Sequence, residues 1–123
     1  MKRSRRCHWR TPLCLGLVLL LVSSHSIACR AEPATGGKCF ALRGRIYLSN
    51  GTPSMRISPI GSHRILGVLP AENEDAPENI KQGVTFDQSA IADIEVCPLT
   101  QAKMGEMQMV CVRSASNVTF KNP

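Results

Sequence analysis

The segment "CFALRGRIYLSNGTPSMRISPI", residues 39–60, decides the fold class of this chain. From Phe40 to Leu48 one alternate set of residues is apolar, with one glycine, and the other set carries two arginines and a tyrosine. This period of two predicts a half-buried strand. The tract "SNGTP" at 49–53 is typical of a turn, because asparagine and glycine accept positive φ. A second strand is therefore expected over 54–60.

The rest of the chain shows the same short periodic segments. A third strand is expected at 64–69, and the acidic segment 71–83 is expected to hold one or two helical turns. Further strand-like segments are 84–86, 91–97, 107–112 and the "NVTF" tail at 117–120. We therefore predict an all-β fold, a small single-domain barrel or sandwich of about five to six strands with one short helix.

The first 28 residues have the organisation of a secretory signal. A cationic start precedes the apolar run "LCLGLVLLLV" at 13–22, and small residues occupy Ser26 and Ala28 before the expected cut. The apolar run is too short to cross a bilayer as a helix. The sequence thus divides into a signal peptide at 1–28, a linker at 29–38 and a β-domain at 39–123.

The charge balance changes when this signal is removed. The whole chain has 15 basic and 9 acidic residues and a net charge of +6. Five of the basic residues lie in the signal, so the exported chain has a net charge near +1. The basic excess therefore does not favour a nucleic-acid partner.

Cys29 directly follows the predicted signal, and two fates are open to it. An ordinary signal peptidase, served by Ser26 and Ala28, would leave Cys29 as the first residue. Bacterial lipoprotein signals place a lipid-modified cysteine at the same point, usually with leucine three residues earlier. Here that residue is Ser26, so "SIAC" departs from the pattern. Cys29 is a candidate for lipidation or for a disulfide.

Four cysteines follow the signal, and export makes disulfides the expected state. In 91–97 and 107–112, the alternation that turns the valines inward turns Cys97 and Cys111 outward on neighbouring antiparallel strands. A disulfide between Cys97 and Cys111 is the pairing that we expect. Cys39 would then pair with Cys29, or stay free if Cys29 is lipidated.

Several strings resemble an uncharacterised family of small exported bacterial proteins. They are "CF" at 39–40, "GR" at 44–45, "NGTPSMRI" at 50–57, "RILGV" at 64–68, "VCPLT" at 96–100 and "GEMQMVCV" at 105–112. The resemblance covers most of residues 39–113 and implies export and a single domain. It implies no catalytic activity.

Few residues invite a chemical role. His63 is the only histidine after the signal, and a lone histidine in a polar turn is usually solvated. Arg43, Arg45 and Arg56 would form a basic face across paired strands, suited to an anionic partner, although an ordinary polar sheet face is the simpler interpretation. Cysteine and methionine side chains are soft-metal ligands. The residues of that kind near the second predicted pair of strands are Cys97, Met104, Met107, Met109 and Cys111.

These observations favour a non-catalytic binding or structural module of the cell envelope. We expect a periplasmic protein with an unidentified envelope component as its partner, no cofactor, no metal site and no nucleic-acid partner. Contact with the membrane is expected only through a lipid at Cys29. The alternative is a redox or copper-handling periplasmic protein that uses Cys97, Cys111 and the nearby methionines.

Overall fold

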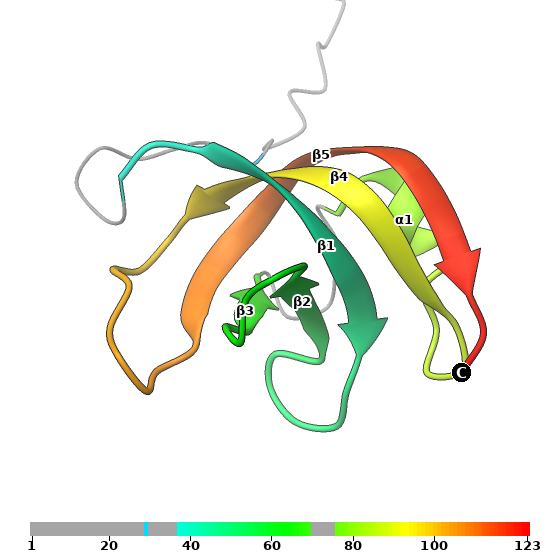
Figure 1. The fold of residues 1–123 in the computed structure, drawn as a ribbon, viewed down its shortest axis with the longest axis horizontal. Coiled ribbons are helices and arrows are strands. Elements are labelled where there is room, and N and C mark those ends of the chain that lie inside the picture. Colours follow the sequence, from blue (N-terminus) through cyan, green and yellow to red (C-terminus); the bar gives the residue numbers. More distant parts are fainter. Residues whose placement is uncertain (1–28, 30–36, 70–75) are drawn as a thin grey trace, which may run out of the picture.

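The structure, a computed structural model, describes Cys29 and residues 37–69 and 76–123. The strands close into a barrel in the order β1-β2-β3-β5-β4 (Figure 1). In chain order the elements are β1 (Phe40–Leu48), β2 (Met55–Pro59), β3 (Leu66–Val68), α1 (Glu78–Lys81), β4 (Ser89–Pro98) and β5 (Gln108–Lys121). The predicted small all-β barrel is thus confirmed.

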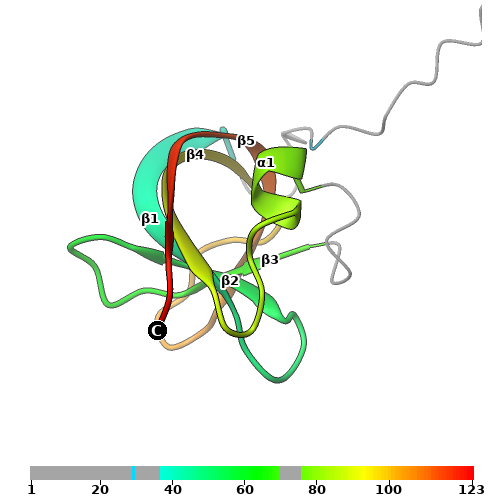
Figure 2. The same ribbon diagram turned by 90° about the vertical axis from the view of Figure 1, so that its right-hand side faces the viewer.

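The connections between the strands define the topology. β1 runs antiparallel to both β2 and β4, and β3 runs parallel to β5. α1 stands between β3 and β4 in the chain and lies beside the barrel in Figure 2. Five strands in this order, with one helix after the third, have the topology of the OB-fold, a small Greek-key barrel. The fold by itself assigns no function.

Gly44 lies where β1 changes partner. Residues 44–46 pair with β4 on one side and with β2 on the other. A Cβ on Gly44 would lie 2.9 Å from Leu42 Cδ1 and 3.0 Å from Ile57 Cγ2. The missing side chain therefore lets β1 coil tightly enough to belong to both halves of the barrel.

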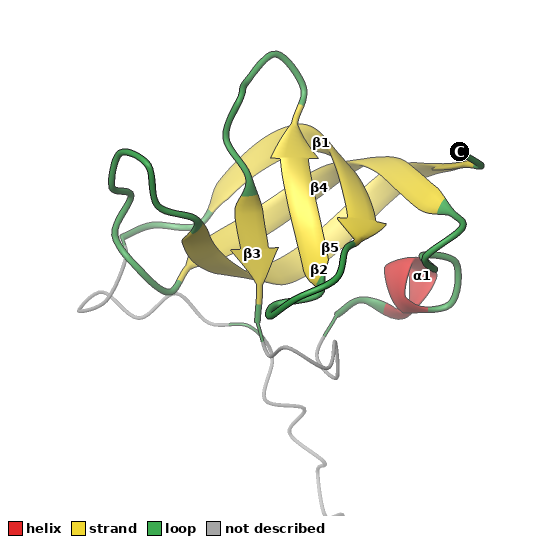
Figure 3. Cartoon of the chain, turned by 90° about the horizontal axis from the view of Figure 1, so that it is seen from below, coloured by secondary structure: helices red, strands yellow, loops and turns green. Residues whose placement is uncertain are grey.

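The inward residues of all five strands fill the barrel. The buried apolar side chains on the strands are Ile46, Met55, Ile57, Leu66, Val68, Ala90, Ala92, Ile94, Val96, Val110 and Val112. From α1, Ile80 joins them with no exposed surface. α1 lies at one end of the barrel, and the β4–β5 loop extends at the opposite end (Figures 1 and 3). In the part of the chain that the structure describes, no helix is long and apolar enough to cross a membrane.

Two of the expected strands differ in the structure. Residues 84–86 form a turn into β4, with one isolated bridge between Thr85 and Gln88, so the expected strand there is wrong. The segments 107–112 and 117–120 belong to one long strand, β5. Asn117 has φ 49°, beside a shift of register with β4. This bulge keeps one strand continuous across a stretch that lacks apolar alternation.

Candidate functional site

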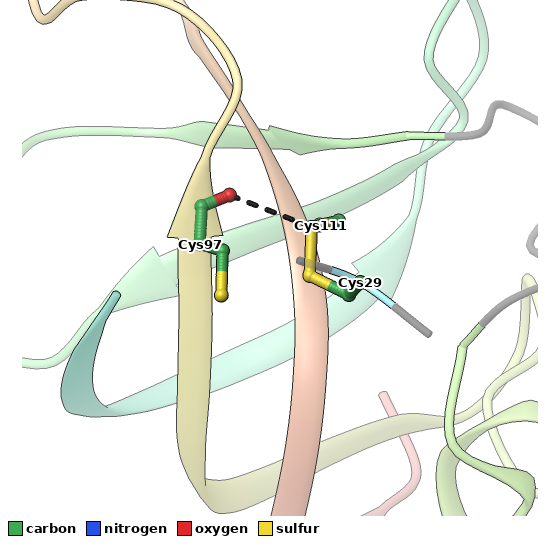
Figure 4. A group of neighbouring side chains, drawn as sticks. All are labelled: Cys29, Cys97 and Cys111. Carbon is green, nitrogen blue, oxygen red and sulfur yellow. Dashed lines mark hydrogen bonds between the residues drawn. A yellow bond between two sulfur atoms is a disulfide. The ribbon is translucent and has the colours of Figure 1, made fainter. Parts of the chain in front are cut away.

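The four described cysteines, Cys29, Cys39, Cys97 and Cys111, meet at one place on the outside of the barrel. Cys97 of β4 and Cys111 of β5 are register partners, as the sequence predicted (Figure 4). β1 lies on the other side of β4, with Phe40 opposite Val96, so Cys39 lies opposite Cys97. Cys97 is therefore the middle member of a row, Cys39, Cys97 and Cys111, across three strands.

The expected pairing of these cysteines is wrong. The disulfides join Cys29 to Cys111 and Cys39 to Cys97. The alternation within β4 and β5 indicates their hairpin but not the closure of the barrel, which brings β1 against β4. Across that seam the Cα atoms of Cys39 and Cys97 are 4.0 Å apart. All four cysteines predicted to form disulfides do so, but Cys97 and Cys111 each pair with a cysteine outside the β4–β5 hairpin.

Burial distinguishes the four sulfurs. Cys97 has no exposed surface and Cys111 is 6% exposed, although both point away from the core. Cys29 and Cys39 are partly exposed. Cys97 and Cys111 are thus largely covered, and of the four described cysteines Cys29 and Cys39 are the more accessible to a reagent.

Lipidation of Cys29 and its disulfide need the same atom. A lipid thioether would use Cys29 Sγ, and in this structure that Sγ is bonded to Cys111. The two states exclude one another. A lipidated Cys29 would leave Cys111 as a thiol and would leave the Cys39–Cys97 disulfide in place.

The same sulfurs form a candidate metal cluster after reduction. The Sγ atoms of Cys29, Cys97 and Cys111 all lie within 4.8 Å of one another (Figure 4). Cys39 Sγ is bonded to Cys97 Sγ and so belongs to the same cluster. In the disulfide state no thiolate is available, so the cluster could hold a soft metal ion only in reduced protein.

A groove lies between the β2–β3 loop and the β4–β5 loop. Its volume is about 620 Å³. Its lining includes His63, Arg64, Ile65, Lys103, Met104 and Met107. Met104 is fully exposed and Ile65 is 39% exposed, so apolar surface faces solvent beside three basic side chains. His63 and Met104 are separate candidates in the sequence, and local patterns do not bring them together because they lie on loops far apart in the chain.

The basic side chains of the groove are not equally free. The Arg64 guanidinium donates to Gln108 Oε1 at 2.6 Å, which holds it against β5. Lys103 lies 4.0 Å from Glu106 in an exposed pair. An exposed ion pair of this kind contributes little to stability, so Lys103 can leave Glu106 for a ligand at a small cost in free energy.

Two predicted methionines converge on β3. A Cβ at Gly67 would lie 2.8 Å from both Met107 Sδ and Met109 Sδ. The two thioethers are therefore neighbours, and glycine makes the room for them. Met104 does not join them. It stands exposed on the loop.

The three arginines of the predicted basic face all point outward, but each has an internal partner. Arg43 Nη1 lies 2.8 Å from Asp93 Oδ1. Arg45 donates to Ser89 Oγ and stacks over the Tyr47 ring, with 5.8 Å to its centroid. Arg56 donates to backbone carbonyls of the β1–β2 turn. All three arginines of this outer face are thus hydrogen-bonded within the barrel, and the charge of Arg43 is balanced by Asp93.

Asp93 is the carboxylate with a shifted proton affinity. The Asn117 side chain donates to Asp93 Oδ2 at 2.7 Å, and Arg43 donates to the other oxygen. The Asn117 hydrogen bond, followed by the Arg43 contact, lowers the Asp93 pKa below 3.8. The ionised form is therefore favoured, which suits a structural ion pair rather than a general acid.

Comparison with known proteins adds nothing to these observations. No family model, no curated protein and no solved structure matches this chain. The resemblance to a family of small exported proteins stays a prediction, and the function must be inferred from the site alone.

Proposed function

We propose that this protein is an exported, non-catalytic binding module of the cell envelope, and that it binds through the groove between its β2–β3 and β4–β5 loops. The groove carries the proposal because it combines exposed apolar surface, on Met104 and Ile65, with basic side chains on both loops. Exposed apolar surface beside polar groups is typical of interaction sites. OB-folds bind oligonucleotides and oligosaccharides through the face of β2 and β3 and the β1–β2 and β4–β5 loops, and the groove shares the β4–β5 loop with that surface.

The chemistry of the described residues supports binding rather than catalysis. His63 lies in the groove, but the other groove residues near it are arginine, isoleucine, methionine and lysine, and the one carboxylate, Glu106, faces Lys103. Nucleophilic catalysis needs a base held by an orienting group beside a nucleophile. A ligand with acidic and apolar groups fits this lining better than a reacting substrate.

Nuclear magnetic resonance can test the groove directly. We would titrate isotope-labelled protein with soluble peptidoglycan fragments and, separately, with vesicles of anionic phospholipid. Shifts confined to residues 60–65 and 99–107 are expected with one of these probes. The variant Lys103→Gln/Met104→Ala should weaken that binding severalfold, whereas the control Arg43→Gln/Arg45→Gln should not. Shifts centred on the arginine face, or none with either probe, would contradict the proposal.

The alternative function, soft-metal handling, is favoured by one observation, the convergence of Met107 Sδ and Met109 Sδ over Gly67. Thioethers bind Cu(I) without deprotonation, so this pair can act even when the cysteines are oxidised. Adding Cu(I) should raise the melting temperature of wild-type protein. The variant Met107→Leu/Met109→Leu keeps the side-chain volume and should abolish the shift. An equal shift in both proteins would rule these methionines out.

A further inference from the structure

The row of cysteines across β1, β4 and β5 gives Cys97 two possible partners. Cys39 faces it from β1 and is its partner in this structure. Cys111 faces it from β5, and the Sγ atoms of Cys97 and Cys111 lie within 4.8 Å of each other. The pairing of Cys97 can therefore change by movement of side chains alone, with the strands fixed.

We propose that the four cysteines form one thiol–disulfide exchange system, which a small thiol enters at Cys29 and in which the bond at Cys97 moves from Cys39 to Cys111. This inference deepens the redox alternative. It does not depend on any ligand of the loop groove, so either proposal can fail alone.

Access favours Cys29 within the Cys29–Cys111 bond, because Cys29 is partly exposed and Cys111 is 6% exposed. Cys39 is also partly exposed, so peptide mapping must distinguish entry at Cys29 from entry at Cys39. An incoming thiolate attacks Cys29 Sγ and forms a mixed disulfide with it. The Cys29–Cys111 bond breaks, and Cys111 leaves as a thiolate. Its Sγ lies 3.6 Å from the Cys97 carbonyl oxygen, which accepts a hydrogen bond when the sulfur carries a proton.

The second step occurs inside the protein. The Cys111 thiolate attacks Cys97 Sγ and forms the Cys97–Cys111 disulfide. The Cys39–Cys97 bond breaks, and Cys39 leaves as a thiolate. This step involves no net oxidation or reduction, because one disulfide and one thiolate are replaced by another disulfide and another thiolate.

Arg113 favours Cys39 as the final thiolate. Its Nη1 lies 4.0 Å from Cys39 Sγ, and the same guanidinium is 3.5 Å from Glu95. A cation next to a cysteine lowers the thiol pKa and makes the thiolate a better leaving group. Arg113 lies at the bulge in β5, between Val112, which pairs with Val96, and Ser114, which pairs with Glu95. It is a positioning residue for the exchange.

Peptide mapping can follow each sulfur. The exported chain would be treated with less than one equivalent of reduced glutathione, blocked with N-ethylmaleimide in acid and cut with trypsin. Cuts after Arg30, Arg43, Lys81 and Lys103 leave the four cysteines on four different peptides. We expect glutathione on Cys29, maleimide on Cys39, and residues 82–103 joined to residues 104–113.

Two products would overturn the proposal. Maleimide on Cys111 with an intact Cys39–Cys97 bond would show that the second step does not occur. Glutathione on Cys39 would show that the thiol enters from the other side.

Variants give an independent measurement. Cys29→Ser removes the entry sulfur and leaves Cys111 free, so wild-type pairing would give Cys39–Cys97 alone, whereas exchange gives a mixture that includes Cys97–Cys111. Adding Arg113→Gln should lower the Cys39 thiolate fraction severalfold and move its alkylation profile to higher pH. Arg43→Gln, which removes another exposed arginine–carboxylate pair whose carboxylate also lies on β4, is the matched control and should leave the profile unchanged. A mixture that never contains Cys97–Cys111 contradicts the inference.

Discussion

Two seams of the barrel join strands that are not consecutive in the chain, and the two differ in length and in the bonds that cross them. Between β1 and β4 the pairing runs from Phe40 opposite Val96 to Ile46 opposite Ala90, and a disulfide and an ion pair cross the same seam. Between β3 and β5 the pairing is parallel and limited to the 3 residues of β3. The candidate groove opens beside the short seam and the cysteine row lies across the long one. Ligand access and covalent bonding thus occupy different parts of the barrel.

The largest effect should follow from breaking the long seam. Cys39→Ala/Cys97→Ala removes a disulfide with a sequence separation of 58. In the chain-entropy model this costs about 4 kcal/mol of unfolding free energy. Chemical denaturation monitored by far-ultraviolet circular dichroism measures the loss. A loss below about 1 kcal/mol would mean that the strand pairing alone closes this seam.

The second effect concerns the core under the short seam. Leu66 of β3 is 2% exposed and packs in the core. Leu66→Ala should cost about 3 kcal/mol, the transfer of the side chain plus the cavity left behind. Its neighbour Ile65 is 39% exposed, so Ile65→Ala should cost less than about 1 kcal/mol. Equal losses, measured by the same denaturation experiment, would mean that β3 is not anchored through the core.

A smaller effect is expected on the outside of β3. A Cβ at Gly67 would lie 2.7 Å from Pro53 Cγ and close to both methionine sulfurs. Gly67→Ala should therefore cost about 1 to 3 kcal/mol through overpacking. Met109→Ala in the same chain should recover part of this loss, because one contact disappears. An additive loss in the double variant would show that the clash is with Pro53 or Met107 and not with Met109.

The smallest effect should come from the ion pair on the long seam. The pKa of Asp93 is lower in the folded chain than its ordinary 3.8. The stabilisation by its carboxylate is therefore complete above about pH 4 and is lost as the pH falls through the lower, folded-state pKa. Asp93→Asn should flatten the acid side of the stability profile, measured as urea midpoints from pH 2 to pH 7.

The contribution of Asn117 can be separated from that of Arg43. Asn117→Gly keeps a residue that accepts the positive φ and removes the amide donor. It should flatten the same profile, because the Asn117 hydrogen bond is the first cause of the lowered pKa of Asp93. Arg43→Gln removes both a hydrogen bond and a charge and should flatten it as well. An unchanged profile in Asn117→Gly would show that Arg43 alone lowers the Asp93 pKa.

Local alternation was enough to predict the fold class but not the closure. The alternation from Phe40 to Leu48 predicts β1 correctly, and the turn at 49–53 predicts its hairpin with β2. The sequence could not show that β1 also pairs with β4, because that contact joins residues far apart in the chain. The wrong disulfide pairing has the same cause. Cys97 was assigned to its hairpin neighbour, whereas the barrel brings Cys39 to its other side.

Local sequence patterns could not predict the candidate groove, for a related reason. The signals were a histidine in one polar turn and a methionine in another, and neither is informative alone. Only the parallel pairing of β3 with β5 brings the two loops together. The outward direction of Arg43, Arg45 and Arg56 was predictable. Asp93 and Ser89, the partners of Arg43 and Arg45, belong to β4, and local alternation does not show that β4 lies beside β1.

The Cys29–Cys111 bond also determines how the domain carries mechanical load. Tension applied at Cys29 reaches Cys111 of β5 through one covalent bond. Cys111 pairs with Cys97 of β4, so the load passes into the long antiparallel pairing of β4 with β5 and not into the three residues of β3.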